Sequence, residues 1–184
     1  MRNADEIWTR VDSKAPAYIE LSDTVWGTPE LAYGEHRSAA EHLAMLKREG
    51  FRVTENVAGI PTALMAEAGE GGPVIAILGE YDALPGLSQE AGLAEPKPVD
   101  GQGGVGHGCG HNLLGSAAML AAASVKDWLT ERGLPGRVRY YGCPAEEGGA
   151  AKGFMVRDGA FGDVDIAISW HPASFSGVNE PVSL

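Results

Sequence analysis

The sequence has few cysteines, few basic residues and no long apolar run. Cys109 and Cys143 are its two cysteines among 184 residues, too few for a disulfide framework. It carries 14 Lys and Arg against 25 Asp and Glu, a net charge of -11, which excludes the basic footprint of a nucleic-acid binder. No apolar run approaches the roughly 20 residues of a membrane span, and residues 1–20 lack the apolar stretch of a signal peptide. We therefore expect a cytoplasmic protein with no nucleic-acid and no membrane partner.

Apolar periodicity and turn residues predict alternating helices and strands. Helices are expected over residues 4–26 with an interruption or bend near Pro16, and over 35–49, 112–130 and 150–157. Strands are expected at 51–57, 62–66, 73–78, 136–143 and 164–170, the last as a third core strand. The run VIAILG is nearly all apolar, as expected of a central strand covered on both faces. The pattern predicts a three-layer α/β domain with a largely parallel central sheet.

Side chains that bind metals follow the predicted strands or open a predicted helix. HGCGHN contains Cys109 and His111, CPAEEGG contains Glu146 and Glu147, and His171 directly follows IAISW. Thiolate, imidazole and carboxylate are the ligand types of zinc and neighbouring first-row metals. Ligands of open α/β sheets bind at the carboxyl ends of the strands, so we expect these groups to share one pocket.

Each group also has an ordinary structural interpretation. Cys109 can be a small buried hydrophobe, the paired glutamates a solvated surface, and His171 a core histidine. Asp82, in GEYDALPG, equally suits a loop aspartate that stabilises a turn, and Cys143 suits packing at a strand end. Convergence on strand ends favours one site over several unrelated explanations.

The adjacent glutamates suggest a division of labour. One carboxylate can bind a metal ion while the other faces water held by that ion. A divalent ion lowers the pKa of such water and polarises a substrate carbonyl. The second carboxylate can accept the proton and pass it to a leaving amine. This arrangement predicts amide hydrolysis.

Four stretches, PVIAILGEYDALPGLSQEAG, GHGCGHNLLG, YGCPAEEGGAAKGFMVRDGAF and SWHPASF, resemble the two-metal amidohydrolases and exopeptidases. This family includes aminoacylases, hippurate hydrolase and indoleacetyl-amino-acid hydrolases. The resemblance implies a zinc-exopeptidase-like catalytic domain with two divalent metal ions, Mn or Zn. It implies Glu146 as general base and acid, and as metal ligands it implies Cys109, His111, Glu147 and His171. His171 follows Glu147 by 24 residues, which matches the family's spacing.

The same resemblance assigns supporting roles to three further residues. Asp82 matches an aspartate that can orient a ligand imidazole from a second layer around the metal. His107 and Asn112 are expected in that second layer at most. Asn112 departs from the wider family, which usually carries Asp at this position.

The resemblance also implies parts beyond this chain. Family members continue into a lid and dimerisation domain and then complete the catalytic domain, with one more histidine ligand. We therefore expect residues 1–184 to be the N-terminal part of the metallohydrolase catalytic domain, incomplete at the C-terminus. The intact protein is expected to hydrolyse a small N-acyl or N-aroyl amino acid, first of all aminobenzoyl-glutamate. It is expected to form a homodimer, or a heteromer with a paralogous subunit.

Two other interpretations stay open at this point. The chain can be a truncated, non-catalytic module that binds a metal or a partner. It can also be a thiol redox protein that uses Cys109 and Cys143, in which case replacing Cys143 would be disabling.

Overall fold

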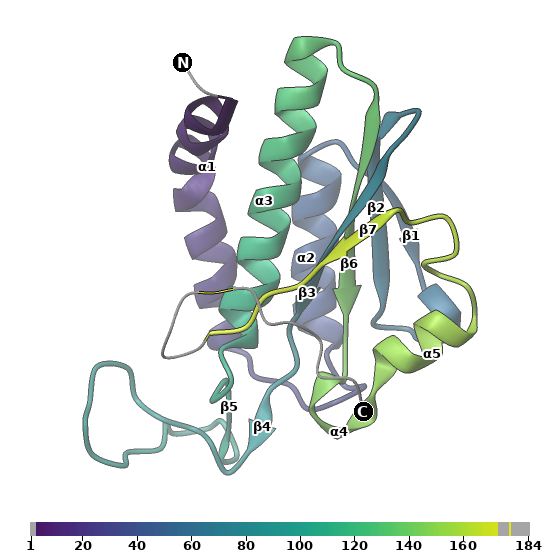
Figure 1. Ribbon diagram of the computed structural model, residues 1–184. Coiled ribbons are helices and arrows are strands. Elements are labelled where there is room, and N and C mark those ends of the chain that lie inside the picture. Colours follow the sequence, from purple (N-terminus) through teal and green to yellow (C-terminus); the bar gives the residue numbers. More distant parts are fainter. Residues whose placement is uncertain (1–2, 173–176, 178–184) are drawn as a thin grey trace.

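Three helices stack on one face of the central sheet (Figure 1). In the computed structural model, which describes residues 3–172 and 177, they are α1 (Asn3–Trp26), α2 (His36–Arg48) and α3 (His111–Arg132). Buried apolar residues recur at helical spacing on α2, among them Ala39 and Leu46. Pro16 lies inside α1, which remains one helix across it rather than being interrupted. Residues 173–175 of the stretch SWHPASF lie outside the described residues.

The sheet has five strands in the order β1-β2-β6-β3-β7. Their bounds are β1 (Arg52–Glu55), β2 (Leu64–Glu70), β3 (Val74–Glu80), β6 (Gly136–Cys143) and β7 (Ile166–Ile168). β3 pairs in parallel with both β6 and β7, whereas β2 pairs antiparallel with both β1 and β6. Four strands of this sheet therefore run in one direction, and β2 runs against them. The predicted α/β fold with a largely parallel sheet is confirmed.

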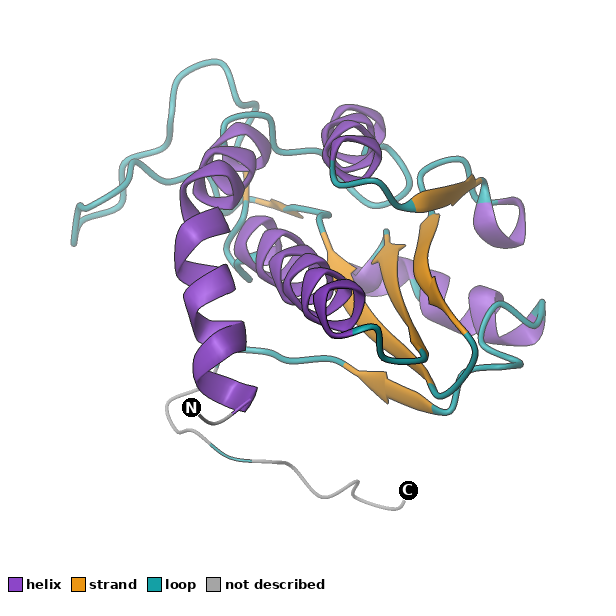
Figure 2. Cartoon of the chain, turned by 90° about the horizontal axis from the view of Figure 1, so that it is seen from above, coloured by secondary structure: helices purple, strands orange, loops and turns teal. Residues whose placement is uncertain are grey.

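The opposite face of the sheet carries α4 (Glu146–Gly149), α5 (Ala151–Arg157) and the short turn η1 (Val57–Gly59), as the view from above indicates (Figure 2). Side chains of β6 alternate between the two faces because successive residues of a strand point in opposite directions. Tyr140 packs with the core under α1 to α3, and Tyr141 packs with the core that includes Met155 of α5. These are the three layers of the fold.

β7 is an edge strand in the described sheet, so its prediction as a core strand is wrong. Ile166 and Ile168 are each 49% exposed. β7 pairs with β3 on one side, and no described element packs over its side chains as α3 packs over β3 and β6. The apolar composition of the segment is therefore not matched by burial within residues 3–172.

The long connection between β3 and α3 contains a short antiparallel pair. β4 (Leu84–Pro85) pairs with β5 (Val105–Gly106), which brings the chain back to the start of α3. No helix in the described part of the chain combines the length and the apolar character needed to cross a membrane.

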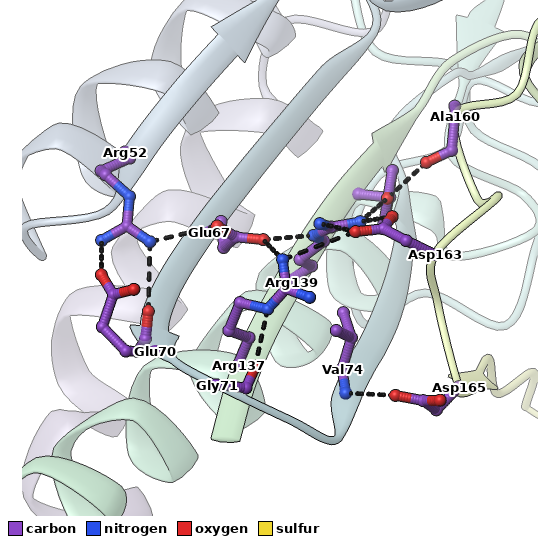
Figure 3. Close-up of polar contacts among 12 residues, drawn as sticks. Arg52, Glu67, Glu70, Gly71, Val74, Arg137, Arg139, Ala160, Asp163 and Asp165 are labelled. Atoms are coloured by element: carbon purple, nitrogen blue, oxygen red, sulfur yellow. Dashed lines mark hydrogen bonds and ion pairs between the residues drawn. The ribbon is translucent and has the colours of Figure 1, made fainter. Parts of the chain in front are cut away.

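A network of ion pairs joins three strands on the α5 side of the sheet (Figure 3). Glu67 on β2 accepts hydrogen bonds from Arg52 on β1 and from Arg137 and Arg139 on β6. Arg139 also donates two hydrogen bonds, of 2.6 and 2.7 Å, to Asp163 in the connection to β7. Since Arg139 is buried, this network lets a charged side chain lie within the sheet.

Candidate metal centre

Ligand-type side chains meet at the carboxyl ends of the parallel strands. The chain turns there after β3, β6 and β7, and α3 begins at the same end of the molecule (Figure 1). Parallel strands end at a common edge, which brings together residues far apart in the sequence. The residues brought together are Glu80, Asp82, Cys109, His111, Glu146, Glu147 and His171.

His111 is oriented by Asp82. Its Nδ1 donates to Oδ1 of Asp82 over 2.9 Å, and both side chains are fully buried. The other Asp82 oxygen, Oδ2, accepts the backbone N–H of Glu147 at 2.9 Å. Nε2 of His111 is buried and makes no hydrogen bond to any described residue. This is the arrangement of a metal-binding imidazole, in which a carboxylate fixes one nitrogen and leaves the other free.

Three carboxylates surround the free nitrogen of His111. The Glu80 Oε2 atom lies 3.2 Å from Nε2, and Glu146 Oε2 and Glu147 Oε1 each lie 3.9 Å from it. The other oxygen of Glu80 pairs with the ammonium group of Lys152 on α5. Glu80 was not predicted as a site residue from the sequence. It ends β3 two positions before Asp82, so the same strand-end rule would have found it.

Cys109 and His171 form a second contact at this centre. The thiol donates to Nε2 of His171, at a distance of 3.0 Å from sulfur to nitrogen, while Nδ1 of His171 donates to the carbonyl of Pro172. The interpretation of His171 as a core histidine is wrong, because the residue is exposed. Cys109 is partly exposed and so is not a wholly buried hydrophobe.

Two ligand groups share His111. The ligand atoms of Cys109, His111 and His171 all lie within 4.8 Å of one another, and so do those of Glu80, His111 and Glu146. Nitrogen with sulfur in one group and nitrogen with carboxylate oxygen in the other suit first-row transition ions. The donor set therefore fits the divalent metals that the sequence led us to expect.

Burial and neighbouring charges set the protonation of both ligand types. Burial lowers the pKa of His111, but the hydrogen bond and charge of Asp82, with the charge of Glu80, raise that pKa above its usual value. Burial and then the Glu147 carboxylate raise the pKa of Cys109 to about 11. The thiol therefore stays protonated at neutral pH until a cation stabilises its thiolate.

The second cysteine does not form a reactive pair with Cys109. Burial raises the pKa of Cys143 to about 12, and its sulfur contacts the carbonyl of Tyr141 on its own strand. Reactive thiols have a lowered pKa. Both thiols here have a raised pKa, which gives no support to a thiol redox protein.

His107 and Asn112 are directed toward α1 rather than toward the ligand groups. Nε2 of His107 donates to the carbonyl of Val25 at 3.2 Å, and burial lowers the pKa of His107 to about 4. The Asn112 amide donates to Oγ of Ser22 at 3.0 Å. Their contacts anchor the start of α3 to α1, while Asp82 makes the direct hydrogen bond to the candidate ligand His111.

Residues 76–181, which include all of these ligand-type side chains, match Peptidase family M20/M25/M40. The chain belongs to this family. The match begins within β3 and spans both glutamates, so it covers the half of the chain that builds the candidate centre.

The chain is also similar to individual proteins whose names state a hydrolase activity. The chain is 54% identical over 178 residues to a subunit of p-aminobenzoyl-glutamate hydrolase of Escherichia coli, covering 94% of this chain and 37% of that protein. It is 31% identical over 161 residues to hippurate hydrolase of Campylobacter jejuni, covering 86% of this chain and 40% of that protein. The chain thus spans well under half the length of these relatives.

A solved structure agrees with the fold. The Bacillus subtilis YXEP protein, described as a dinuclear metal-binding peptidase of the M20 family, is 27% identical and superposes with a TM-score of 0.73. The superposition covers 88% of this chain and 44% of that one. The three-layer arrangement is therefore that of the M20 fold.

Proposed function

We propose that the intact protein is a metal-dependent amidohydrolase that cleaves the amide bond of an N-acyl or N-aroyl amino acid. The observation that carries the proposal is the buried Asp82–His111 pair, which leaves Nε2 of His111 free beside three carboxylates. Relatives named for hydrolysis of p-aminobenzoyl-glutamate and hippurate support this substrate class. We propose p-aminobenzoyl-glutamate as the first substrate to test. We also propose that residues 1–184 form the N-terminal part of the catalytic domain.

The residues divide into ligands and a proton carrier in this proposal. Cys109, His111, Glu147 and His171 hold two divalent ions, Mn or Zn. When bound, such ions lower the pKa of water and polarise a carbonyl group. Glu146, whose side chain is 42% exposed at the centre, takes the proton of the attacking water and donates it to the leaving nitrogen.

A cavity beside Glu146 offers room for the substrate. Its volume is about 760 Å³, within the range of small-molecule sites, roughly 300–1,000 Å³. Leu78, Ile168 and Trp170 supply apolar wall, and Glu80 and Lys152 line it together with Glu146. An aromatic acyl group suits these apolar residues, and Glu146 lines the same cavity, as its proposed role at the scissile amide requires.

Metal analysis of the purified chain tests this proposal. We expect bound or readily acquired Mn or Zn, with a higher metal content in the wild type than in a His111→Ala variant. The intact protein should then release an aromatic amine from p-aminobenzoyl-glutamate. A folded chain that takes up neither ion overturns the proposal.

The alternative is a non-catalytic module that binds a metal or a partner. The same assay of amine release distinguishes it from the hydrolase. Turnover by the 184-residue chain with added Mn, at a rate comparable to the intact protein, rejects the module. Metal binding without turnover by the intact protein rejects the hydrolase.

We also propose that the intact protein assembles as a homodimer or with a paralogous subunit. The support is the name of its Escherichia coli relative, which is called a subunit. Light scattering on the intact protein, alone and mixed with the paralogue, measures the assembly. A monomer under both conditions contradicts this part of the proposal.

A further inference from the structure

The segment that carries the two glutamates has an unusual backbone. α4 (Glu146–Gly149) lies between two alanines, Ala145 and Ala150, that both have φ of 51°. Residues with a side chain rarely adopt this left-handed region, and they persist there when surrounding contacts hold them. The contacts that hold this segment are therefore of interest for the position of the glutamates.

Glu35 supplies the first of these contacts from the far end of the sequence. Its Oε1 atom accepts the backbone N–H of Ala145 at 2.8 Å and that of Tyr33 at 2.9 Å. Its Oε2 atom accepts a hydrogen bond from Oγ1 of Thr62 at 3.1 Å. Glu35 precedes α2, yet its side chain makes no capping bond to that helix.

The Glu35 carboxylate is costly to bury. The residue is fully buried, and none of the described Lys or Arg side chains forms an ion pair with it. Burial raises the pKa of Glu35, against the hydrogen bonds from Ala145 and Tyr33. Buried polar groups of this kind can serve to specify one local geometry. Here the geometry specified is that of the residue directly before Glu146.

Tyr33 holds the other end of the same segment. Its hydroxyl donates to the carbonyl of Gly149 at 2.6 Å. A Cβ added at Gly149 would lie 2.8 Å from the Tyr33 ring, so the ring and the backbone are in close contact. Asp82 binds the N–H of Glu147 between these two points. The three contacts hold positions 145, 147 and 149, that is, Glu147 itself and one residue on each side of the glutamate pair.

We propose that Tyr33 and Glu35 are positioning residues that hold Glu146 and Glu147 facing His111. The inference rests on the proposed function, since it assigns these residues a part in the same metal centre. Among the described residues, neither side chain forms a hydrogen bond with a ligand atom. They act through the backbone of the segment that carries the carboxylates.

Amide hydrogen exchange in the metal-free chain tests the contact itself. Tyr33→Phe removes only the hydroxyl, from a residue that is 41% exposed, and so preserves the fold. We expect exchange across residues 145–149 to rise about fivefold, the effect of one lost hydrogen bond. Glu35→Gln, which replaces one acceptor oxygen with an amide group, should raise exchange in the same residues.

Binding of Mn²⁺ by the same variants tests the positioning role. We expect the dissociation constant to rise about tenfold in each, as is typical when residues around the ligands are altered. Tyr141→Phe is the matched control, because the Tyr141 hydroxyl also donates to a backbone carbonyl at 2.6 Å, that of Ala160. It should lower thermal stability while leaving both exchange at 145–149 and Mn²⁺ affinity unchanged.

The outcomes separate this inference from the proposed function. Unchanged exchange in Tyr33→Phe and Glu35→Gln, with normal Mn²⁺ binding by the wild type, overturns the positioning role alone. Weaker Mn²⁺ binding in Tyr141→Phe as well overturns it too, because a general loss of stability then explains the effect. Absence of Mn²⁺ and Zn²⁺ binding by the folded wild type overturns both proposals.

Discussion

Asp82 and His111 form a fully buried pair that joins the end of β3 to the first residue of α3. The carboxylate spans 2.9 Å to Nδ1 of the imidazole and, through its other oxygen, also binds the backbone of Glu147. One side chain thus connects three segments that meet at the candidate centre. We expect the centre to be sensitive to any change in its acceptor atoms.

Asp82→Asn should weaken metal binding. An amide replaces one oxygen with an NH₂ group, which opposes either the His111 N–H or the Glu147 N–H. Altering such a partner typically costs about 10-fold to 100-fold in metal affinity. Calorimetric titration with Mn²⁺ measures the change. Asp165→Asn is the control, since Asp165 also accepts a backbone N–H, that of Val74 at 2.7 Å. Equal affinities in Asp82→Asn and the wild type would contradict the assignment.

Glu146 and Glu147 should respond differently to the same substitution. We expect Glu146→Gln to retain the metal and lose turnover, because it removes the proton acceptor. Glu147→Gln should instead lose metal, because it removes a proposed ligand. Metal content by mass spectrometry and amine release by the intact protein measure the two effects. Loss of metal in both variants, or in neither, would show that the roles are wrongly divided.

Lys152→Met should strengthen divalent metal binding. The ammonium group pairs with Glu80, whose other oxygen lies 3.2 Å from Nε2 of His111. Removing a positive charge so close to the centre reduces repulsion of the ion, and we expect affinity to rise about fivefold at low salt. Lys97→Met removes an ammonium that pairs with Glu90 at 3.0 Å in the loop after β4, and should have no effect. An affinity that falls in Lys152→Met would refute the electrostatic explanation.

Substitutions of the two cysteines should have different effects on metal binding, measured by the same calorimetric titration. Cys109→Ser is expected to weaken Zn²⁺ binding, since serine replaces the sulfur that contacts His171. Cys143→Ser should leave binding unchanged, because its sulfur contacts the carbonyl of Tyr141. A disabling effect of Cys143→Ser would revive the redox interpretation.

Stability should fall in acid through the ion-pair network of Figure 3. Hydrogen bonds from Arg139 lower the pKa of Asp163 to about 2, from an ordinary value of 3.8. The pair therefore stabilises the fold above about pH 4, and this contribution disappears as the pH falls through about 2. Urea unfolding between about pH 4.5 and 2 should show a smaller loss of stability in Asp163→Asn than in the wild type. Parallel pH profiles for the two proteins would argue against this linkage.

Several elements were predictable from local pattern alone. The strand expected at 136–143 is β6 with the same bounds, because its Val and Tyr residues lie between Pro135 and Pro144. The strand expected at 62–66 begins instead at Leu64 and continues as β2 to Glu70, where the polar residue Glu67 pairs with arginines on both neighbouring strands. β7 was predicted as core because composition reports how apolar a segment is and not which neighbours cover it.

The candidate centre likewise contains residues that the sequence indicated and contacts that only the fold creates. Residue types and strand-end positions, both readable along the chain, indicated Cys109, His111, the paired glutamates and His171. The contacts of Glu80 with Lys152 and of Glu35 with Ala145 span 72 and 110 positions of the sequence. Local sequence patterns do not predict such contacts. A glutamate is expected to be exposed to solvent, and only the tertiary structure shows that it is buried.

The sequence by itself therefore determined the chemistry available at the centre, because side-chain type decides which atoms can bind a metal or move a proton. The tertiary structure decided which of those atoms are free, since the Asp82 bond leaves only Nε2 of His111 open. It also decided what holds them in place, because side chains from distant parts of the sequence clamp the backbone of residues 145–149.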